Sequence, residues 1–138
     1  MTNIKQLIVL RGLPGSGKST FANFYKNNLH PELSSIICSA DSFLYENNEY
    51  IWTKERVIKA HEKCFQLAEE SMINNINIII LDNTNIKSSD YKYYRKIARK
   101  YNYEYVSLII ENIHNTKSIH NVNKETLNNQ RKNFTINL

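Results

Sequence analysis

The glycines of this 138-residue chain are its most restrictive feature. There are only three, and they fall within six consecutive positions, at Gly12, Gly15 and Gly17. Glycine permits backbone conformations and close approaches that a Cβ atom would prevent. Because the chain has no glycine elsewhere, we expect its backbone to wrap closely around a ligand in this segment.

The glycine segment fits the pattern of a phosphate-binding loop and has the required context. It reads Gly12-Leu13-Pro14-Gly15-Ser16-Gly17-Lys18-Ser19-Thr20, after an apolar run that predicts a strand and before a predicted helix. In such loops backbone N–H groups surround phosphate oxygens, the lysine neutralises the β and γ phosphates, and the serine hydroxyl ligates Mg²⁺. We therefore expect residues 12–20 to bind ATP, with Lys18 catalytic and Ser19 at the metal. The alternative is a glycine-rich turn without a ligand, which this context disfavours.

The order of the predicted elements indicates the fold class. Continuous apolar runs alternate with amphipathic segments throughout, which is typical of a parallel sheet covered by helices on both faces. The predicted strands are residues 4–10, 34–39, 77–81 and 104–111, and the predicted helices are residues 18–29, 53–72, 88–101 and 124–133. We expect a single domain, residues 1–138, with a three-layer α/β P-loop NTPase fold and a four-stranded parallel sheet. Asn47, Asn48 and their polar neighbours predict a loop as far as Trp52.

Two aspartates follow predicted strands, at the sheet edge where ligands of such folds bind. Asp41 follows the second strand, where a carboxylate can accept a proton from an attacking hydroxyl, although an aspartate there can also cap a turn. Asp82 closes the run Ile78-Ile79-Ile80-Leu81, an apolar strand ending in an acid, and such an aspartate holds Mg²⁺ together with the loop serine. Asn83, Thr84 and Asn85 either bind substrate or shape the turn.

Charge and aromatic patterns are less specific. The formal net charge of +5 suits a polyanionic partner without requiring one. A helical stripe could contact nucleic acid or be a solvated face, and we favour the solvated face; it comprises Lys92, Arg95, Lys96, Arg99 and Lys100, with tyrosines at 91, 93, 94 and 101 nearby. His61 lies on the apolar stripe formed by Val57, Cys64, Ala68 and Met72, so we expect it in the core rather than in catalysis.

The cellular setting is constrained mainly by what is missing. No segment has about 20 uninterrupted apolar residues, so we expect no membrane span, and the first residues lack a signal-peptide layout. Cys38 and Cys64 have neither a metal-binding nor a disulfide spacing. These features favour a reduced, cytoplasmic environment.

Several segments together resemble the polynucleotide-kinase-like P-loop kinases, which include phage 5′-polynucleotide kinase and the Nedd4-binding proteins. The matching segments span nearly the whole chain; they are Arg11–Thr20, Ser39-Ala-Asp41-Ser-Phe43, Ala60-His61, Leu81-Asp-Asn-Thr-Asn85 and Ile119–Leu127. The resemblance implies transfer of the ATP γ-phosphoryl group to a hydroxyl, with Asp41 as the general base and Lys117 at the place of a lid arginine. Leu44 stands where the phage enzyme has an arginine that helps to bind nucleic acid.

The sequence thus predicts an ATP- and Mg²⁺-dependent kinase that phosphorylates the 5′-hydroxyl of RNA or DNA. Its expected catalytic residues are Lys18, Asp41 and Lys117, and its expected metal ligands are Ser19 and Asp82. Two alternatives remain open. One is a small-molecule kinase that acts on a sugar, nucleoside or antibiotic hydroxyl, and the other is an ATP-binding interaction module with little transfer activity.

Overall fold

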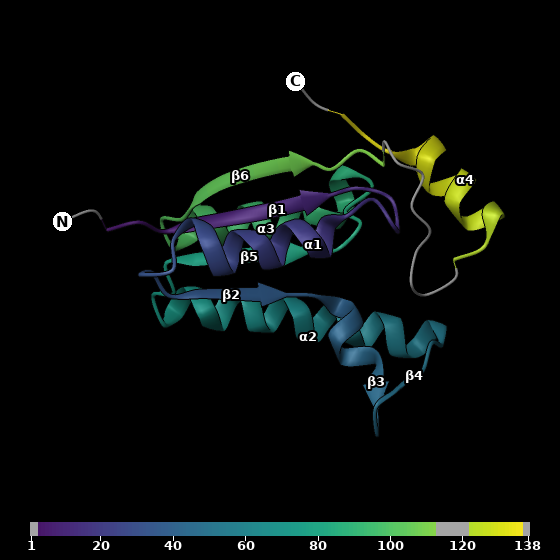
Figure 1. Ribbon diagram of the computed structural model, residues 1–138, viewed down its shortest axis with the longest axis horizontal. Coiled ribbons are helices and arrows are strands. Elements are labelled where there is room, and N and C mark those ends of the chain that lie inside the picture. The colour runs from purple at the N-terminus through teal and green to yellow at the C-terminus, as the bar shows by residue number, and fades with distance from the viewer. Residues whose placement is uncertain (1–2, 113–121, 137–138) are drawn as a thin grey trace.

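A computed structural model describes residues 3–112 and 122–136. Four strands form one parallel sheet in the order β2-β5-β1-β6 (Figure 1). The strands are β1 (Gln6–Arg11), β2 (Ser35–Cys38), β5 (Ile78–Asp82) and β6 (Glu104–Ile109). The predicted α/β fold with a four-stranded parallel sheet is therefore confirmed.

The register of the two central strands brings the sequence motifs to one edge of the sheet. β1 pairs with β5 so that Leu10 lies opposite Asp82, and Arg11 lies opposite Ile109 of β6. Because all four strands point the same way, the segments that follow them meet at the carboxyl edge. The glycine loop follows β1 there, and the turn that contains Asp41 follows β2.

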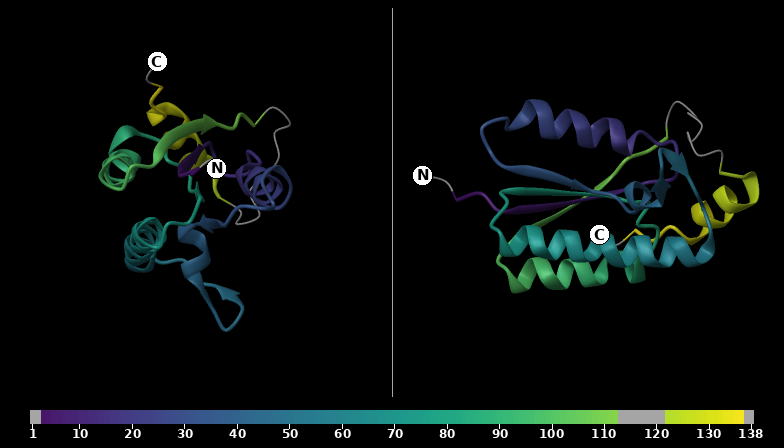
Figure 2. Two further views of the ribbon diagram at one scale, coloured as in Figure 1. Left: turned by 90° about the vertical axis from the view of Figure 1, so that its left-hand side faces the viewer. Right: turned by 90° about the horizontal axis from the view of Figure 1, so that it is seen from below.

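Helices cover both faces of the sheet (Figure 2). Helix α1 (Lys18–Phe24) packs through Ala22 on one face, against Ile8 and Ile80. Helices α2 (Lys54–Ile73) and α3 (Ser88–Lys100) cover the other face and enclose the larger core cluster. That cluster contains fully buried Leu7, Val9, Ile79 and Leu81 of the central strands. The continuous apolar runs of β1 and β5 are explained by this two-sided burial.

Helix α2 begins where the sequence predicted, but it exposes His61, which was expected in the core. Thr53 caps it, since its Oγ1 accepts a hydrogen bond of 3.1 Å from the backbone N–H of Arg56. Cys64, Ala68 and Met72 are buried as expected, whereas His61 is exposed. The expectation of a core histidine was wrong, because Ala60 occupies the buried position at that level of the helix.

Short elements appear where the sequence indicated a plain helix end or a loop. The helix predicted to reach Leu29 changes after α1 into a π-helical turn, η1 (Tyr25–Leu29). A 3₁₀ helix, η2 (Ala40–Leu44), carries Asp41 and is followed by a small antiparallel hairpin, β3 (Tyr45–Glu46) and β4 (Glu49–Tyr50). Asn47 and Asn48 form the hairpin turn with φ of 51° and 66°. This hairpin replaces the expected loop.

The last helix, α4 (Lys124–Asn133), has the predicted bounds and lies beyond the carboxyl edge of the sheet (Figure 1). Asn123 caps it by accepting a hydrogen bond of 2.7 Å from the N–H of Thr126. None of its residues is buried, so α4 has no core of its own. No helix among the described residues has the length and apolar character needed to cross a bilayer.

Candidate functional site

The glycine loop has a backbone that only glycine accommodates at two positions. Gly15 and Gly17 have φ of 82° and 103°, in the region that side chains disfavour. A Cβ atom at Gly12 would lie 2.6 Å from both the carbonyl oxygen of Ile110 and Oγ of Ser16. The conformation of the loop therefore accounts for glycine at these three positions; that the loop surrounds a ligand stays a prediction. Leu13, Pro14 and Ser16 are partly buried within the loop, and Ser19 and Thr20 are exposed on the first turn of α1.

Lys18 is almost fully buried at the start of α1, with 8% of its surface exposed. Its Nζ donates a hydrogen bond of 3.0 Å to the carbonyl oxygen of Leu13, across the hollow of the loop. Burial lowers the pKa of Lys18, and the charges of Asp82 and Asp41 oppose that effect. The Oγ of Ser16 is buried and has no hydrogen-bond partner among the described residues. Both groups are donors that can hydrogen-bond to a phosphate oxygen.

Ser19 and Asp82 form a direct pair at the rim of the loop. The Ser19 hydroxyl donates a hydrogen bond of 2.7 Å to Oδ2 of Asp82. Burial raises the pKa of Asp82 and the charge of Asp41 adds to this, whereas the Ser19 hydroxyl and Lys18 counteract it. The pairing predicted from sequence is therefore present in the fold.

This pair fits a divalent cation that prefers oxygen ligands. A buried carboxylate and a hydroxyl within hydrogen-bond distance are the protein ligands that Mg²⁺ uses beside a nucleotide. No group of three or more His, Cys, Asp and Glu residues that could hold a metal occurs in the described part of the chain. The remaining ligands would have to be phosphate oxygens and water, which is how Mg²⁺ is bound when it accompanies a nucleotide.

Asp41 lies exposed in the first turn of η2. The Tyr50 hydroxyl donates a hydrogen bond of 3.3 Å to its Oδ1 from the hairpin. Burial, the charge of Asp41 and this hydrogen bond raise the pKa of Tyr50 to about 12, so the hydroxyl stays protonated near neutral pH. Tyr50 was not among the predicted site residues, because the sequence predicted a loop here and not a hairpin that returns to Asp41.

The turn after β5 connects the loop to the Asp41 segment. Its Thr84 carbonyl accepts a hydrogen bond of 3.0 Å from the N–H of Gly12, and Oδ1 of Asn83 accepts one of 2.9 Å from the N–H of Ala40. Asn85, with φ of 47°, donates through Nδ2 to the carbonyl oxygen of Leu10 at 2.8 Å. Asn83 and Asn85 therefore shape the turn, and they also line the cavity beside it.

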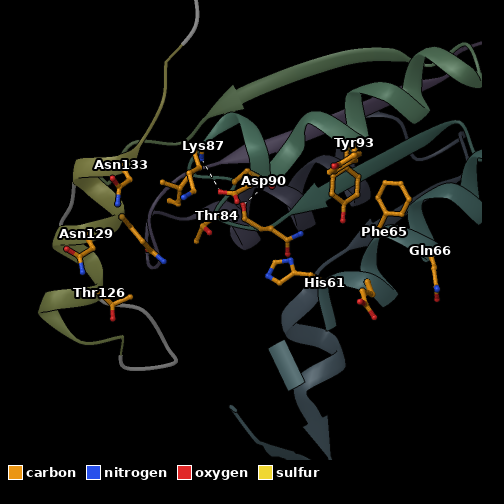
Figure 3. A pocket seen from close by; sticks show the side chains of 16 residues that line it. His61, Phe65, Gln66, Thr84, Lys87, Asp90, Tyr93, Thr126, Asn129 and Asn133 are labelled. Carbon is orange, nitrogen blue, oxygen red and sulfur yellow. Dashed lines mark hydrogen bonds between the residues drawn. The ribbon is translucent and has the colours of Figure 1, made fainter. Parts of the chain in front are cut away.

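That cavity, of about 870 Å³, lies between α2, α3 and α4 (Figure 3). The turn 83–87 forms its floor, α2 supplies His61 and Phe65, and α3 supplies Tyr93. Helix α4 closes the far side with Asn129, Gln130 and Asn133, and Oε1 of Gln130 is buried without a hydrogen-bond partner among the described residues. Its walls are aromatic and amide-rich, and its floor is hydrogen-bonded to both the phosphate loop and the Asp41 segment.

Arg11, directly before the loop, is a buried cation that the sequence did not single out as functional. Its guanidinium donates hydrogen bonds of 2.7, 2.9 and 2.6 Å to the carbonyl oxygens of Asn85, Ile86 and Thr135. The rings of Tyr91 and Phe134 lie 4.5 and 4.6 Å from its central carbon. Arg11 thus joins the phosphate loop, the turn 83–87 and the segment that follows α4.

Leu44 and Lys117, which were considered for substrate binding and for the lid, do not contribute to the site as described. Leu44 is 2% exposed and packs in the larger core cluster, so its side chain does not reach the site. Lys117, the expected lid cation, lies outside the described residues. The structure therefore brings together the phosphate loop, Asp41 and Asp82.

Comparison with known families identifies the chain. Residues 6–137 match the family described as "Chromatin associated protein KTI12", and the chain therefore belongs to the KTI12 family. Human NEDD4-binding protein 2 is 37% identical over 98 residues, which cover 71% of this chain and 5% of the human protein. The chain spans 5%, 42% and 20% of the lengths of three curated relatives that it matches. The expected resemblance to the polynucleotide-kinase-like group is confirmed.

Solved structures with this fold include nucleotide complexes. Kti12 of Chaetomium thermophilum with ADP-AlF3 has a TM-score of 0.64 and 15% identity, over 94% of this chain and 80% of that chain. A chain of the Pnkp1/Rnl/Hen1 RNA repair complex has a TM-score of 0.61 and 20% identity, over 80% of this chain and 34% of that chain. The fold is therefore that of P-loop kinases.

Proposed function

We propose that this KTI12-family chain is an ATP-dependent kinase that transfers the γ-phosphoryl group to a hydroxyl, with the 5′-hydroxyl of RNA or DNA as the acceptor. The observation that carries the proposal is the convergence of one cation and two carboxylates at the phosphate loop. Burial lowers the pKa of Lys18, and the charges of Asp82 and Asp41 both oppose this lowering, although the three residues come from different elements. Phosphoryl transfer needs a phosphate-binding cation, a metal-binding carboxylate and a base in this arrangement.

Each residue has a role that follows from its position. In the proposed complex, Lys18 exchanges its hydrogen bond to Leu13 for the β and γ phosphates, which compensate its buried charge. Ser19 and Asp82 would hold Mg²⁺, which supplies charge neutralisation at the phosphates when bound. Asp41 accepts the proton of the attacking hydroxyl, with Tyr50 fixing the carboxylate by its hydrogen bond. Lys117 is proposed as a lid cation that stabilises charge on the transferred group.

A nucleic-acid acceptor is supported by two separate observations. One structural relative with the same fold belongs to a complex described as an RNA repair complex. The cavity at the turn 83–87 also has the aromatic and amide lining that a nucleobase needs, with a volume in the usual range for ligand sites. A sugar acceptor alone would leave most of that cavity empty.

The test is transfer of label from γ-labelled ATP to a mixed set of 5′-hydroxyl RNA and DNA oligonucleotides. We expect labelled oligonucleotides with the wild-type chain, and no label with Lys18→Ala or Asp41→Asn. Lys26→Ala is the control, since Lys26 is exposed on η1 and is not one of the proposed site residues. If ATP binds but label appears only on small hydroxyl compounds, the acceptor is a small molecule and the polynucleotide proposal is wrong.

A second function is favoured by one specific residue. The buried Leu44 occupies the place of an arginine that helps to bind nucleic acid in the phage enzyme, and its burial leaves no substrate contact there. The second candidate is therefore a nucleotide-binding interaction module with weak turnover. It predicts tight ATP binding and an ATP hydrolysis rate that Asp41→Asn leaves unchanged.

A further inference from the structure

The outer face of α3 carries a row of exposed cations that the proposed chemistry does not use. They are Lys92, Arg95, Lys96 and Arg99, called here the α3 basic face. None of them forms a salt bridge with another residue of the described segments. Cations in the last turn of a helix are favoured by its dipole, which accounts for Arg99. The dipole does not account for Lys92 and Lys96, which lie in earlier turns.

The α3 basic face is joined to the cavity by one aromatic side chain. Four cations and Tyr93 line a shallow hollow of about 460 Å³ on the outer side of α3. Tyr93 also lines the cavity between α2, α3 and α4, as Phe65 does (Figure 3). Its side chain is 55% exposed, with Nζ of Lys92 5.0 Å from the ring centre. The two hollows therefore adjoin at Tyr93.

The two hollows differ in the chemistry that they can bind. The cavity is lined by aromatic rings and amides, and its one lysine, Lys87, is accompanied by the carboxylates of Glu62 and Asp90. Such a lining suits a base better than a phosphate. The α3 basic face instead offers four positive charges and no carboxylate. A chain of bases linked by phosphates satisfies both, and single-stranded nucleic acid is bound by this combination of stacking rings and cations.

The pattern does not fit a lipid surface. Helices that lie on membranes present several large apolar side chains beside their cations. On α3, Tyr93 is the sole large hydrophobic residue that is exposed. The positive charge alone would attract either partner, but the aromatic and amide-lined cavity next to it favours the polynucleotide.

We propose that the α3 basic face is the docking track for the backbone of a single-stranded polynucleotide, whose 5′-terminal base enters the cavity past Tyr93. This inference rests on the proposed kinase function for the position of the 5′ end. The first nucleotide lies in the cavity, next to the turn 83–87, and later phosphates lie along Lys92, Lys96 and Arg99. The α3 basic face then increases the affinity for long acceptors and leaves the affinity for short acceptors unchanged.

The test compares two double variants that each remove two positive charges. Lys92→Gln/Lys96→Gln alters the track, and Lys26→Gln/Lys54→Gln is the matched control, because both of its lysines are exposed on other elements. Binding is measured by fluorescence anisotropy with 3′-labelled, 5′-hydroxyl oligonucleotides of about 12 nucleotides, the size that such sites cover. A dinucleotide serves as the short acceptor, and KCl is varied. Melting temperatures verify that both variants are folded.

We expect the track variant to bind the long oligonucleotide about tenfold more weakly than the control variant, with a salt slope reduced by about 1.4. Its affinity for the dinucleotide should equal that of the control. Equal affinities of both variants for the long oligonucleotide would overturn the docking track. Failure of the kinase function is a separate result, because it shows as absence of label transfer to any acceptor while the binding difference persists.

Discussion

The guanidinium of Arg11 donates a hydrogen bond of 2.6 Å to the carbonyl oxygen of Thr135, 124 residues further along the chain. Thr135 in turn donates through its N–H to the carbonyl oxygen of Ile86 at 2.8 Å. The residue before the phosphate loop therefore holds the segment after α4, and α4 forms one wall of the cavity. Arg11 in this way helps to position the segment that follows this wall of the cavity.

We expect Arg11→Lys to destabilise the protein by about 3 kcal/mol, because a lysine cannot reach three carbonyl groups or stack between two rings. Equilibrium unfolding in urea measures this change. Arg131→Lys on the exposed side of α4 is the control and should change stability by less than about 0.5 kcal/mol. A loss as small as that control for Arg11→Lys would show that the three hydrogen bonds do not hold the C-terminal segment.

Replacing Asp82 by asparagine should stabilise the nucleotide-free protein at neutral pH. Burial raises the pKa of this carboxyl above its ordinary value of 3.8, so its ionisation at pH 7 is less favourable in the folded than in the unfolded chain. Asp82→Asn removes that cost, and its side-chain oxygen can still accept the hydrogen bond from Ser19. We expect a higher melting temperature for Asp82→Asn, together with weaker Mg²⁺-dependent ATP binding.

The difference in stability between the wild-type chain and Asp82→Asn should grow as the pH rises. Below pH 3.8 the carboxyl is protonated in both states, and the two proteins should be equally stable. As the pH rises through the folded-state pKa, the wild-type chain loses stability relative to Asp82→Asn. A wild-type protein more stable than Asp82→Asn at pH 7 would contradict the raised pKa.

The residues at the carboxyl edge of the sheet could be predicted from the sequence, because short segments of neighbouring residues indicate them. The run Ile78–Leu81 is buried on both faces, so it predicts a central strand and the position of Asp82 directly. The glycine signal is equally local, since the positive φ of 82° at Gly15 and 103° at Gly17 favours glycine at those two positions. Each of these features depends on a few neighbouring residues.

Features that depend on distant residues were not predictable in this way. The partners of Arg11 lie 74, 75 and 124 residues away, and nothing near β1 indicates them. The strands of the hairpin that carries Tyr50 have two residues each, too few to show an alternating pattern, although Asn47 and Asn48 are residues that tolerate its turn. Ala60 fits the apolar stripe of α2 as well as His61 does, and the structure buries Ala60, with 2% of its surface exposed, while His61 lines the cavity.

The loop geometry makes Gly12→Ala a steric test of nucleotide binding. The added methyl group would lie 2.6 Å from the carbonyl oxygen of Ile110, which is backbone and cannot turn aside. We expect the loop to shift and ATP affinity to fall by about tenfold or more, since its N–H groups no longer converge. Isothermal titration with Mg²⁺-ATP measures the affinity. Ala22→Gly on α1 controls for a general loss of stability, and unchanged ATP affinity in Gly12→Ala would show that the loop does not need this close approach.

The Tyr50 hydroxyl is expected to matter for transfer rather than for folding. Tyr50→Phe removes the hydrogen bond of 3.3 Å to Oδ1 of Asp41 and leaves the ring, which packs edge-on against Tyr45 at 5.4 Å. If Asp41 is the base, its carboxylate loses a fixed orientation, and the rate of phosphoryl transfer should fall by about three- to tenfold with ATP affinity unchanged. Because the pKa of Tyr50 is about 12, the difference should be constant between about pH 6 and 9. Tyr45→Phe is the matched control and should retain the wild-type rate. A Tyr50→Phe chain that transfers phosphate at the wild-type rate would remove Tyr50 from the site and leave Asp41 oriented by other contacts.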